Sequence, residues 1–347
     1  MATKRKTGND ISEDPIPNKK LKNQEETEDE QNSVPGDTAK LPDLPDEIIH
    51  HIVRLLCIPI QTAAGMSLLS KQWAALFSSL NLDEGDTTRG LCKSDQLVQA
   101  HRKFINFLER YLEFRQRDNY TLHKFRLRMI RYTSSKVSTE DSTRLVDKWL
   151  SFAIERRVKE IDISFKIGHG VRYYCLTLQT LSNAKSITSL KLENIRIMGS
   201  ASTPTGYSTS CFPSLKTMSL SSVKFSPGCQ IFSQLISGCP SIEYLEIYSC
   251  CFHPEMKISS SSLKSLTVMH CKSKAFQVET MNLEYFRFYS NHSILESIHL
   301  SECLNLKRIN ISARWLKNFV SFGWKDSVVA RINTPTVPKF TIFTPAK

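Results

Sequence analysis

Ten cysteines and nine histidines are the residues of this 347-residue chain that could bind a metal ion or act as nucleophiles. A zinc site needs such residues in clusters, usually of the CxxC type, and the sequence has no such cluster. Cys250 and Cys251 are adjacent, as are His50 and His51, which is not ligand spacing. Aliphatic neighbours surround Cys57 and disfavour the reactive thiolate. We therefore expect reduced cysteines and no metal or other cofactor.

Motifs of catalysis are also missing from the sequence. It contains no GxxxxGK[ST], GxGxxG, HExxH or GxSxG pattern, so we expect a protein that is not an enzyme. The N-terminus is polar and charged, unlike a signal peptide, and no run of 18 apolar residues occurs. We therefore expect no membrane segment, and a reducing compartment for the cysteines.

The net charge of +12 is distributed unevenly along the chain. Residues 1–40 carry seven basic and nine acidic side chains, and residues 41–121 carry nine and ten. The other 226 residues hold 30 basic against 15 acidic side chains. This excess favours an acidic partner, such as an acidic protein, a phosphorylated segment or nucleic acid, although a merely soluble basic surface explains it equally well. Nucleic acid is the weaker expectation, because few aromatic residues are interleaved with the basic ones.

Residues 1–40 form a polar tail without aromatic residues, which we expect to be disordered because it cannot bury enough apolar surface. Its two basic clusters resemble a bipartite nuclear import signal. The alternative is a random charged tail. The resemblance implies a nuclear location, with the cytoplasm as a second one. The basic residues are Lys4, Arg5 and Lys6 in the first cluster, and Lys19, Lys20 and Lys22 in the second.

Residues 41–82 show the pattern of three short helices. Leu44 and Pro45 open the first, with two carboxylates in its first turn, and Pro59 ends it. The third, SLLSKQWAALF, extends its apolar stripe to Leu80. Such a small unit has a marginal core, so much of its apolar surface needs a partner.

Two pieces of this stretch, LPDEIIHHIVRLL and QTAAGMSLLSKQW, resemble the F-box of plant F-box/leucine-rich-repeat proteins. The resemblance implies binding to a Skp-type adaptor, and through it to a cullin, in an SCF-type E3 ubiquitin ligase. The alternative is an ordinary helical subdomain that caps the next domain and binds no adaptor. The adaptor contacts that the resemblance implies are Leu44, Pro45, Ile48, Ile52, Leu55, Leu68, Leu69, Ser70 and Trp73.

The polar stretch NLDEGDTTRG at 81–90 starts the connector after the F-box, and residues 83–121 contain the rest of this linker and an amphipathic helix over 95–117. A basic amphipathic helix can lie on a membrane surface, but core packing is the commoner role. The segment also resembles the junction between F-box and repeats in the same plant family. The apolar stripe of the helix consists of Leu97, His101, Phe104, Ile105, Leu108, Tyr111 and Leu112.

From residue 122 an internal repeat of three apolar positions appears, with one copy at VKEIDI (158–163) and another at LEYFRF (283–288). Spacings of 29, 28, 27, 21 and 20 residues between these two lie in the leucine-rich-repeat range. Closer copies from residue 295 predict alternation between a concave and a convex strand, without a fixed phase. The last copy lies near the end of the sequence, where its exposed edge would need a cap or a partner.

In several copies a cysteine or an asparagine lies three residues after the last apolar position of the repeat. Leucine-rich repeats use such residues to hydrogen-bond the turning backbone, which we expect for Cys250, Cys271, Cys303 and Asn291.

The predicted fold class is α/β, a three-helix F-box followed by a leucine-rich-repeat solenoid over 122–347. The resemblance implies a non-catalytic substrate-recognition subunit of an SCF-type ligase, whose repeats bind an unknown target protein that is acidic or phosphorylated. The alternative is a basic repeat scaffold that binds protein or nucleic acid without ligase activity.

Strand alternation indicates which side chains face a target. Lys124, Arg126 and Arg128 precede Glu160 and Asp162 on the next copy, so these two sets could pair with each other. Later copies carry tyrosines and an arginine, residue types enriched in binding hot spots. A rung of small residues separates them, which predicts a shallow aromatic depression; the alternative is that the tyrosines pack against each other or a loop. The predicted target-binding residues are Tyr244, Glu246, Tyr248, Tyr285, Arg287 and Tyr289.

Overall fold

The computed structural model describes most of the chain after residue 78, all of it within the compact unit Pro45–Lys347. The described ranges are 79–88, 90–91, 93–116, 121–129, 139–166, 173–177, 180–181, 183–199, 212–226, 231–252, 255–323, 327–335 and 339–343.

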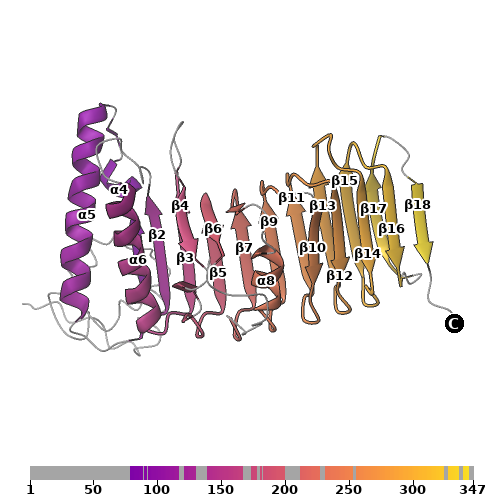
Figure 1. The fold of residues 1–347 in the computed structure, drawn as a ribbon, viewed down its shortest axis with the longest axis horizontal. Coiled ribbons are helices and arrows are strands. Elements are labelled where there is room, and N and C mark those ends of the chain that lie inside the picture. Colours follow the sequence, from indigo (N-terminus) through magenta and orange to yellow (C-terminus); the bar gives the residue numbers. More distant parts are fainter. Residues whose placement is uncertain are drawn as a thin grey trace, which may run out of the picture. The chain divides into compact units, whose positions relative to one another are not determined.

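A ten-stranded parallel sheet is the central element of this unit (Figure 1). Along its strands core-facing residues alternate with outward-facing ones, and down to β15 the core-facing apolar residues are buried. In spatial order the strands are β1 (Ser79–Asp83), β2 (Lys124–Met129), β3 (Glu160–Phe165), β5 (Ser189–Glu193), β7 (Thr217–Ser221), β9 (Tyr244–Tyr248), β11 (Ser265–Met269), β13 (Tyr285–Ser290), β15 (Arg308–Ala313) and β17 (Val329–Asn333).

Helices and two smaller parallel sheets complete the core. The helices are α4 (Gly85–Thr88), α5 (Ser94–Gln116), α6 (Thr139–Glu155) and α8 (Ile231–Ser237). The three-stranded sheet is β4 (Tyr174–Thr177), β6 (Ile195–Met198) and β8 (Lys224–Phe225). The five-stranded sheet is β10 (Glu255–Ser259), β12 (Ala275–Glu279), β14 (Ser297–Ser301), β16 (Asn318–Phe322) and β18 (Lys339–Phe343). Their buried side chains belong to one apolar cluster with those of the ten-stranded sheet.

The structure resolves the phase of the closely spaced repeats. The copies that begin at residues 295, 316 and 337 form β14, β16 and β18 of the five-stranded sheet, whereas the copy at 306 forms β15 of the ten-stranded sheet. The predicted alternation is therefore correct. From β13 to β18 each turn of the chain contributes one strand to the ten-stranded sheet and one to the five-stranded sheet, so two successive strands make up one repeat there.

Repeating turns connect the rungs. Asn194, Ser222, Ser249 and His270 each follow a strand of the ten-stranded sheet with a φ between 51° and 57°. Side chains other than glycine adopt this left-handed conformation infrequently. Here the N–H of each such residue donates to a carbonyl of the next rung; that of Ser249, for example, reaches Met269 O at 2.9 Å. The ladder of hydrogen bonds therefore continues through the turns.

The sheet begins earlier than the repeat pattern indicated. Ser79–Asp83 was expected to be the end of the third F-box helix and the start of a polar connector, but it is the edge strand β1, paired in parallel with β2. Leu80 and Leu82 alternate with polar neighbours and are buried. Two apolar residues are too few to establish a period of two in the sequence.

The amphipathic helix is confirmed as α5. His101, Phe104, Leu108, Tyr111 and Leu112 are buried in the core, and Ile105 packs against it. A second amphipathic helix, α6, and the edge strand β17 were not predicted. None of the described helices is long and apolar enough to span a membrane.

Candidate functional site

The ten-stranded sheet has one face toward the core and one face that is not covered by the described elements. We call the second the open face. It carries three rows of side chains, because parallel strands in register place corresponding residues side by side. One row, for example, runs through Glu246, Thr267, Arg287, Asn310 and Arg331.

The open face of β1–β7 is electrically balanced, with four acidic and four basic side chains at its outward positions. Lys124 Nζ lies 3.1 Å from Glu160, and Arg126 Nε lies 3.5 Å from Asp162. Arg128 lies 3.0 Å from Asp162 and 3.9 Å from Glu193. The basic set and the acidic set therefore pair across neighbouring strands, which was one of the two outcomes left open by the sequence.

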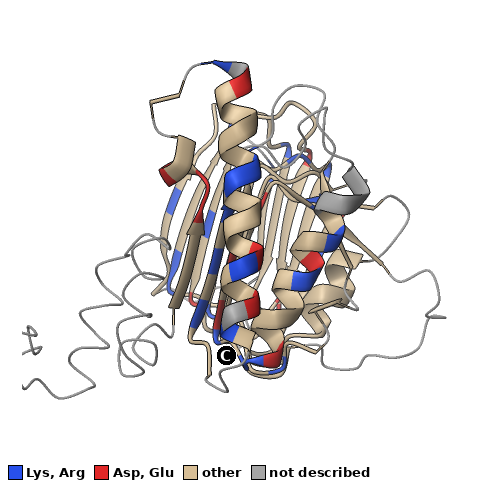
Figure 2. Cartoon of the chain, turned by 90° about the vertical axis from the view of Figure 1, so that its left-hand side faces the viewer, with Lys and Arg blue, Asp and Glu red and all other residues tan. Residues whose placement is uncertain are grey.

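Pairing of charges extends to the helices at the same end of the sheet. Figure 2 shows basic and acidic positions on both α5 and α6. Lys148 of α6 lies 3.8 Å from Glu109 and 3.7 Å from Glu113, both on α5. The exposed charges of this end therefore compensate one another in part.

The open face of β9–β17 has a different character. Its outward positions include four tyrosines, three arginines and one carboxylate, that of Glu246. Tyr244 and Tyr285 are 49% and 42% exposed, which is high for such large side chains. All six predicted target-binding residues occupy outward positions on β9 and β13, with β11 between them.

A depression of about 290 Å³ lies on this part of the open face. It is centred on β11, β13 and β15, so it is displaced from the predicted centre toward the C-terminal strands. Of the six predicted residues it includes Tyr285 and Arg287. Its other polar lining comes from Ser265, Thr267, Arg308 and Asn310, of which the last two were not predicted. Their strand was recognised in the sequence, but its position beside β13 depended on the unresolved phase of the repeats.

The four tyrosines do not pack against one another within the described residues. Tyr289 instead forms an edge contact with His270, whose ring centroid is 4.7 Å away, and accepts a hydrogen bond from Asn291 Nδ2 at 2.9 Å. Burial raises the pKa of the Tyr248 hydroxyl, and the nearby charge of Glu246 adds to this effect. Tyr248 therefore stays protonated at neutral pH and can donate a hydrogen bond.

Three of the four predicted turn residues behave as expected. Cys250 Sγ donates to Tyr248 O at 3.3 Å, Cys271 Sγ to Met269 O at 3.5 Å, and Cys303 Sγ to Ser301 O at 3.4 Å. Asn291 was predicted wrongly. It is exposed, while the preceding Ser290 is buried and accepts a hydrogen bond from His292 N at 3.3 Å. Strand β13 is one residue longer than its neighbour β11, which shifts the turn.

The cysteines show no sign of a metal centre in the described part of the chain. The six described cysteines are free thiols, and no group of three His, Cys, Asp or Glu residues there could hold a metal ion.

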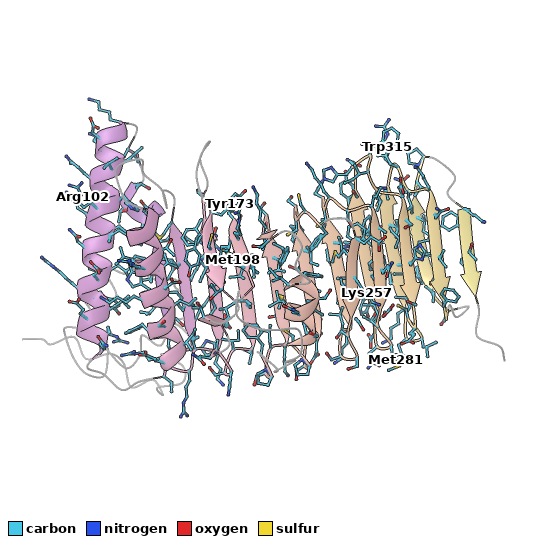
Figure 3. The ribbon with its side chains drawn as sticks, viewed as in Figure 1. Arg102, Tyr173, Met198, Lys257, Met281 and Trp315 are labelled. Carbon is cyan, nitrogen blue, oxygen red and sulfur yellow. The ribbon has the colours of Figure 1, made fainter. Side chains whose placement is uncertain are left out.

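Exposed apolar side chains such as Met198, Met281 and Trp315 lie far apart (Figure 3). They do not form a common patch.

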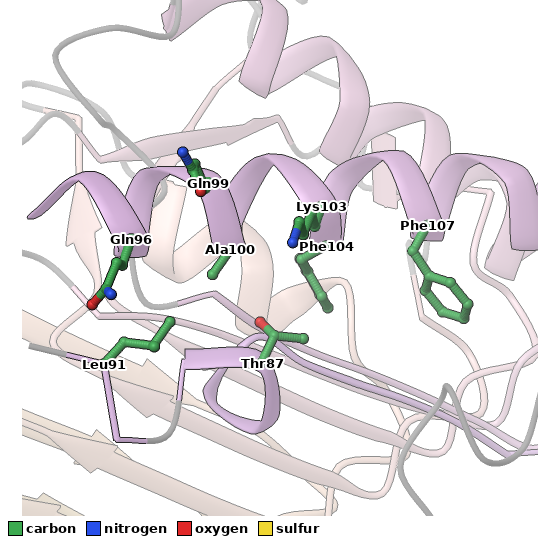
Figure 4. Close-up of a pocket in the computed structure, with 8 residues that line it drawn as sticks. All are labelled: Thr87, Leu91, Gln96, Gln99, Ala100, Lys103, Phe104 and Phe107. Carbon is green, nitrogen blue, oxygen red and sulfur yellow. The ribbon is translucent and has the colours of Figure 1, made fainter. Parts of the chain in front are cut away.

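A buried polar contact lies where the connector meets α5. His101 Nδ1 is 2.8 Å from Glu84 Oε1, and both side chains are almost fully buried. Figure 4 shows the adjacent groove of about 400 Å³, to which Leu91, Ala100 and Phe107 contribute. The contact joins the residue after β1 to the N-terminal half of α5.

The predicted adaptor contacts, Leu44 to Trp73, and the predicted import residues, Lys4 to Lys22, lie outside the described residues, as do His50, His51 and Cys57. These predictions therefore rest on the sequence.

Two family models match this chain. The F-box domain model matches residues 41–84, and the model of the leucine-rich-repeat domain of At1g61320/AtMIF1 matches residues 114–337. The second match covers most of the chain. Together the matches account for the sequence on both sides of α5.

Similar proteins come from Arabidopsis thaliana. Over 294 residues the chain is 29% identical to At5g56400, which bears the name of an FBD-associated F-box protein; this covers 81% of the chain and 57% of the relative. It is 30% identical over 257 residues to At3g59240, named for F-box, FBD and leucine-rich repeats, with 71% and 46% covered. F-box/LRR-repeat protein At3g59210 is 28% identical over 255 residues, with 72% and 48% covered. The chain thus spans about half the length of the curated relatives it matches. The family matches, the parallel repeats and these relatives show that the chain belongs to the plant F-box/leucine-rich-repeat proteins.

Proposed function

We propose that this protein is a substrate-recognition subunit of an SCF-type E3 ubiquitin ligase. An F-box in general implies binding to a Skp-type adaptor, and through it this chain would reach a cullin. The observation that carries the proposal is the direct junction of the two modules: the F-box match runs to residue 84 and so includes β1, the first strand of the ten-stranded sheet.

This role requires no catalytic group in the chain. One module holds the ligase and the other holds a target, so that the target stays close to the ubiquitin-charged enzyme. Proximity of this kind raises the effective concentration of the reacting groups. The open face of β9–β17 is the surface we assign to the target, because it exposes large aromatic and arginine side chains.

The adaptor contact can be tested by substitution at one of two similar sites. Leu44→Ala with Pro45→Ala should abolish co-purification with a Skp-type adaptor, because it removes the apolar anchor of the first F-box helix. The chain offers a matched control, since Leu41→Ala with Pro42→Ala alters the preceding Leu-Pro pair, which is not among the predicted contacts. Wild-type capture of the adaptor by the Leu44/Pro45 variant would contradict the proposal.

The charge of the C-terminal part favours a second candidate, a repeat scaffold without ligase activity that binds an acidic protein or nucleic acid. The adaptor assay separates the two candidates. A scaffold of this kind would not bind the adaptor, and its binding to single-stranded RNA would fall steeply with salt.

We also propose that the N-terminal tail directs the protein to the nucleus, with a share remaining in the cytoplasm. The support is the spacing of two basic clusters, which twelve residues separate.

A further inference from the structure

The arginines on the open face of β13–β17 have no acidic partner among the described residues. Arg287, Arg308 and Arg331 lie on three adjacent strands and are exposed. Glu284, the acidic residue nearest to Arg287 in sequence, is held by Lys307 Nζ at 2.8 Å. The other nearby carboxylate, that of Glu246, is two strands from Arg287 in the same row.

The same sheet provides an internal comparison. Arg126 and Arg128 occupy outward positions of the same face, and the neighbouring strand β3 supplies Asp162 to both. At the equivalent places beside Arg287, strands β11 and β15 supply Thr267 and Asn310, which are uncharged. The first cluster, Arg126 and Arg128, and the second, Arg287, Arg308 and Arg331, both lie at outward positions of the same parallel sheet, but among the described residues only the first has carboxylates beside it. The positive charge of the second cluster is therefore free to bind a ligand.

Two of these arginines line the depression on β11, β13 and β15. Arg308 Cζ lies 5.8 Å from the ring centroid of Tyr285, a cation–π distance that positions the guanidinium beside the depression. Ser265 and Thr267 add hydroxyl groups, and Asn310 adds an amide. No acidic side chain lines it. Such a group of donors suits an anion with several acceptor oxygens, because a guanidinium donates two parallel hydrogen bonds to a phosphate or carboxylate.

We propose that this depression binds a phosphorylated serine or threonine in the target protein. The inference rests on the proposed function in one respect, that the ligand is part of a protein. A phosphoryl group carries close to two negative charges and three acceptor oxygens, which matches two diagonally placed arginines with hydroxyl donors better than a single carboxylate does. Tyr244 and Tyr248 on β9 and Tyr289 on β13 would contact other residues of the same target segment.

An extended nucleic acid fits this face less well. A strand of RNA needs a basic groove that follows its backbone over several nucleotides. Here the positive charge is local, because the basic side chains of β2 are paired with carboxylates of β3. The site is a confined depression with aromatic flanks.

The test uses degenerate peptide libraries and the full-length protein in complex with a Skp-type adaptor. One library has a fixed phosphoserine or phosphothreonine, a second has serine or threonine at that position, and a third has aspartate. We expect at least about tenfold enrichment of the phosphorylated library over both others. Equal capture of the aspartate library would overturn the assignment to phosphate, and equal capture of all three would overturn the site.

Substitutions then locate the binding. Arg287→Gln with Arg308→Gln should reduce capture of the phosphorylated library at least about tenfold, whereas Arg126→Gln with Arg128→Gln removes the same charge from the same face and should leave capture unchanged. Arg287→Lys with Arg308→Lys keeps the charge but loses the paired donors, so an intermediate loss is expected. Thermal unfolding of each variant checks the fold. Undiminished capture by the folded Arg287/Arg308 glutamine variant would overturn the inference.

Two further readouts keep the outcomes distinct. If the wild-type protein does not bind the adaptor, the proposed function is contradicted, but peptide capture can still be measured with the isolated chain. The second readout is binding of single-stranded RNA. The depression is a nucleic-acid site, and the inference is wrong, if RNA competes with the peptides and binds the Arg287/Arg308 variant more weakly, while the phosphorylated library is not enriched over the unmodified one.

Discussion

At the scale of single residues, position in the repeat sets the chemistry of each cysteine. Cys250 is buried at the turn after β9, whereas its neighbour Cys251 is exposed. The hydrogen bond with Cys271 and burial raise the pKa of the Cys250 thiol, and burial raises the pKa of Cys303. A raised pKa means less thiolate at a given pH, and the thiolate is the reactive form.

These differences predict a pattern of alkylation. At pH 8 iodoacetamide should modify Cys251 in the native protein, while Cys250 and Cys303 should react only after a denaturant is added, because their thiols are protonated and shielded. Fragment-ion mass spectrometry can assign the label to either of the two adjacent cysteines. Equal labelling of Cys250 and Cys251 in the native protein would mean that the turn after β9 is not packed as described.

At the scale of elements, β1 decides where the repeat domain begins. It pairs with β2 over five residues and places Leu82 in the core, and the next residue but one, Glu84, contacts His101 of α5. The first strand of the sheet therefore lies inside the F-box match, and a truncation that removes residues up to 84 would expose the edge of β2 and leave His101 without Glu84.

Leu82→Ala should lower the free energy of unfolding by about 2–5 kcal/mol, because the Leu82 side chain is fully buried and its truncation leaves a cavity in the core. Leu304→Ala is the matched control: Leu304 is 43% exposed, and its loss should change stability by about 0.5 kcal/mol or less. Both are measured by urea unfolding. If Leu82→Ala unfolds at the wild-type urea concentration, β1 does not belong to the cooperative unit.

At the scale of the whole molecule, net charge is a poor guide to where ligands bind. Residues 122–347 have twice as many basic as acidic side chains. Yet at the outward positions of their first strands in the ten-stranded sheet, β2 to β7, four basic side chains face three acidic ones, and Asp83 of β1 adds a fourth. Exposed ion pairs add little stability, so these pairs matter chiefly because they neutralise one half of the open face. The uncompensated arginines are confined to the other half.

Charge at the N-terminus supports a separate prediction about location. Lys19→Ala, Lys20→Ala and Lys22→Ala together should lower the nuclear-to-cytoplasmic ratio of a fluorescent fusion, because they remove the second basic cluster of the proposed import signal. Lys40→Ala is the control, since this lysine belongs to the same tail but to neither cluster. An unchanged ratio in the triple variant would mean that these lysines are only solvated charges.

The sequence alone was sufficient for the F-box, for α5 and, in the ten-stranded sheet, for the strands β2, β3, β5, β7, β9, β11 and β13. Each carries a periodic apolar pattern over enough residues to separate a period of 2 from one of 3.6. It also identified the outward positions of β9 and β13, because side chains alternate strictly along a strand.

Tertiary structure decided the rest. The alternating pattern is the same in β14 as in β15, so only the hydrogen-bonded ladders tell which strand belongs to which sheet. Arg126 and Asp162 are 36 positions apart in the sequence and become neighbours only through the register of β2 and β3. The uncharged neighbour of Arg287, Thr267, likewise comes from another strand through register. Local pattern determines the face on which a side chain lies, but the charge beside it comes from a distant rung.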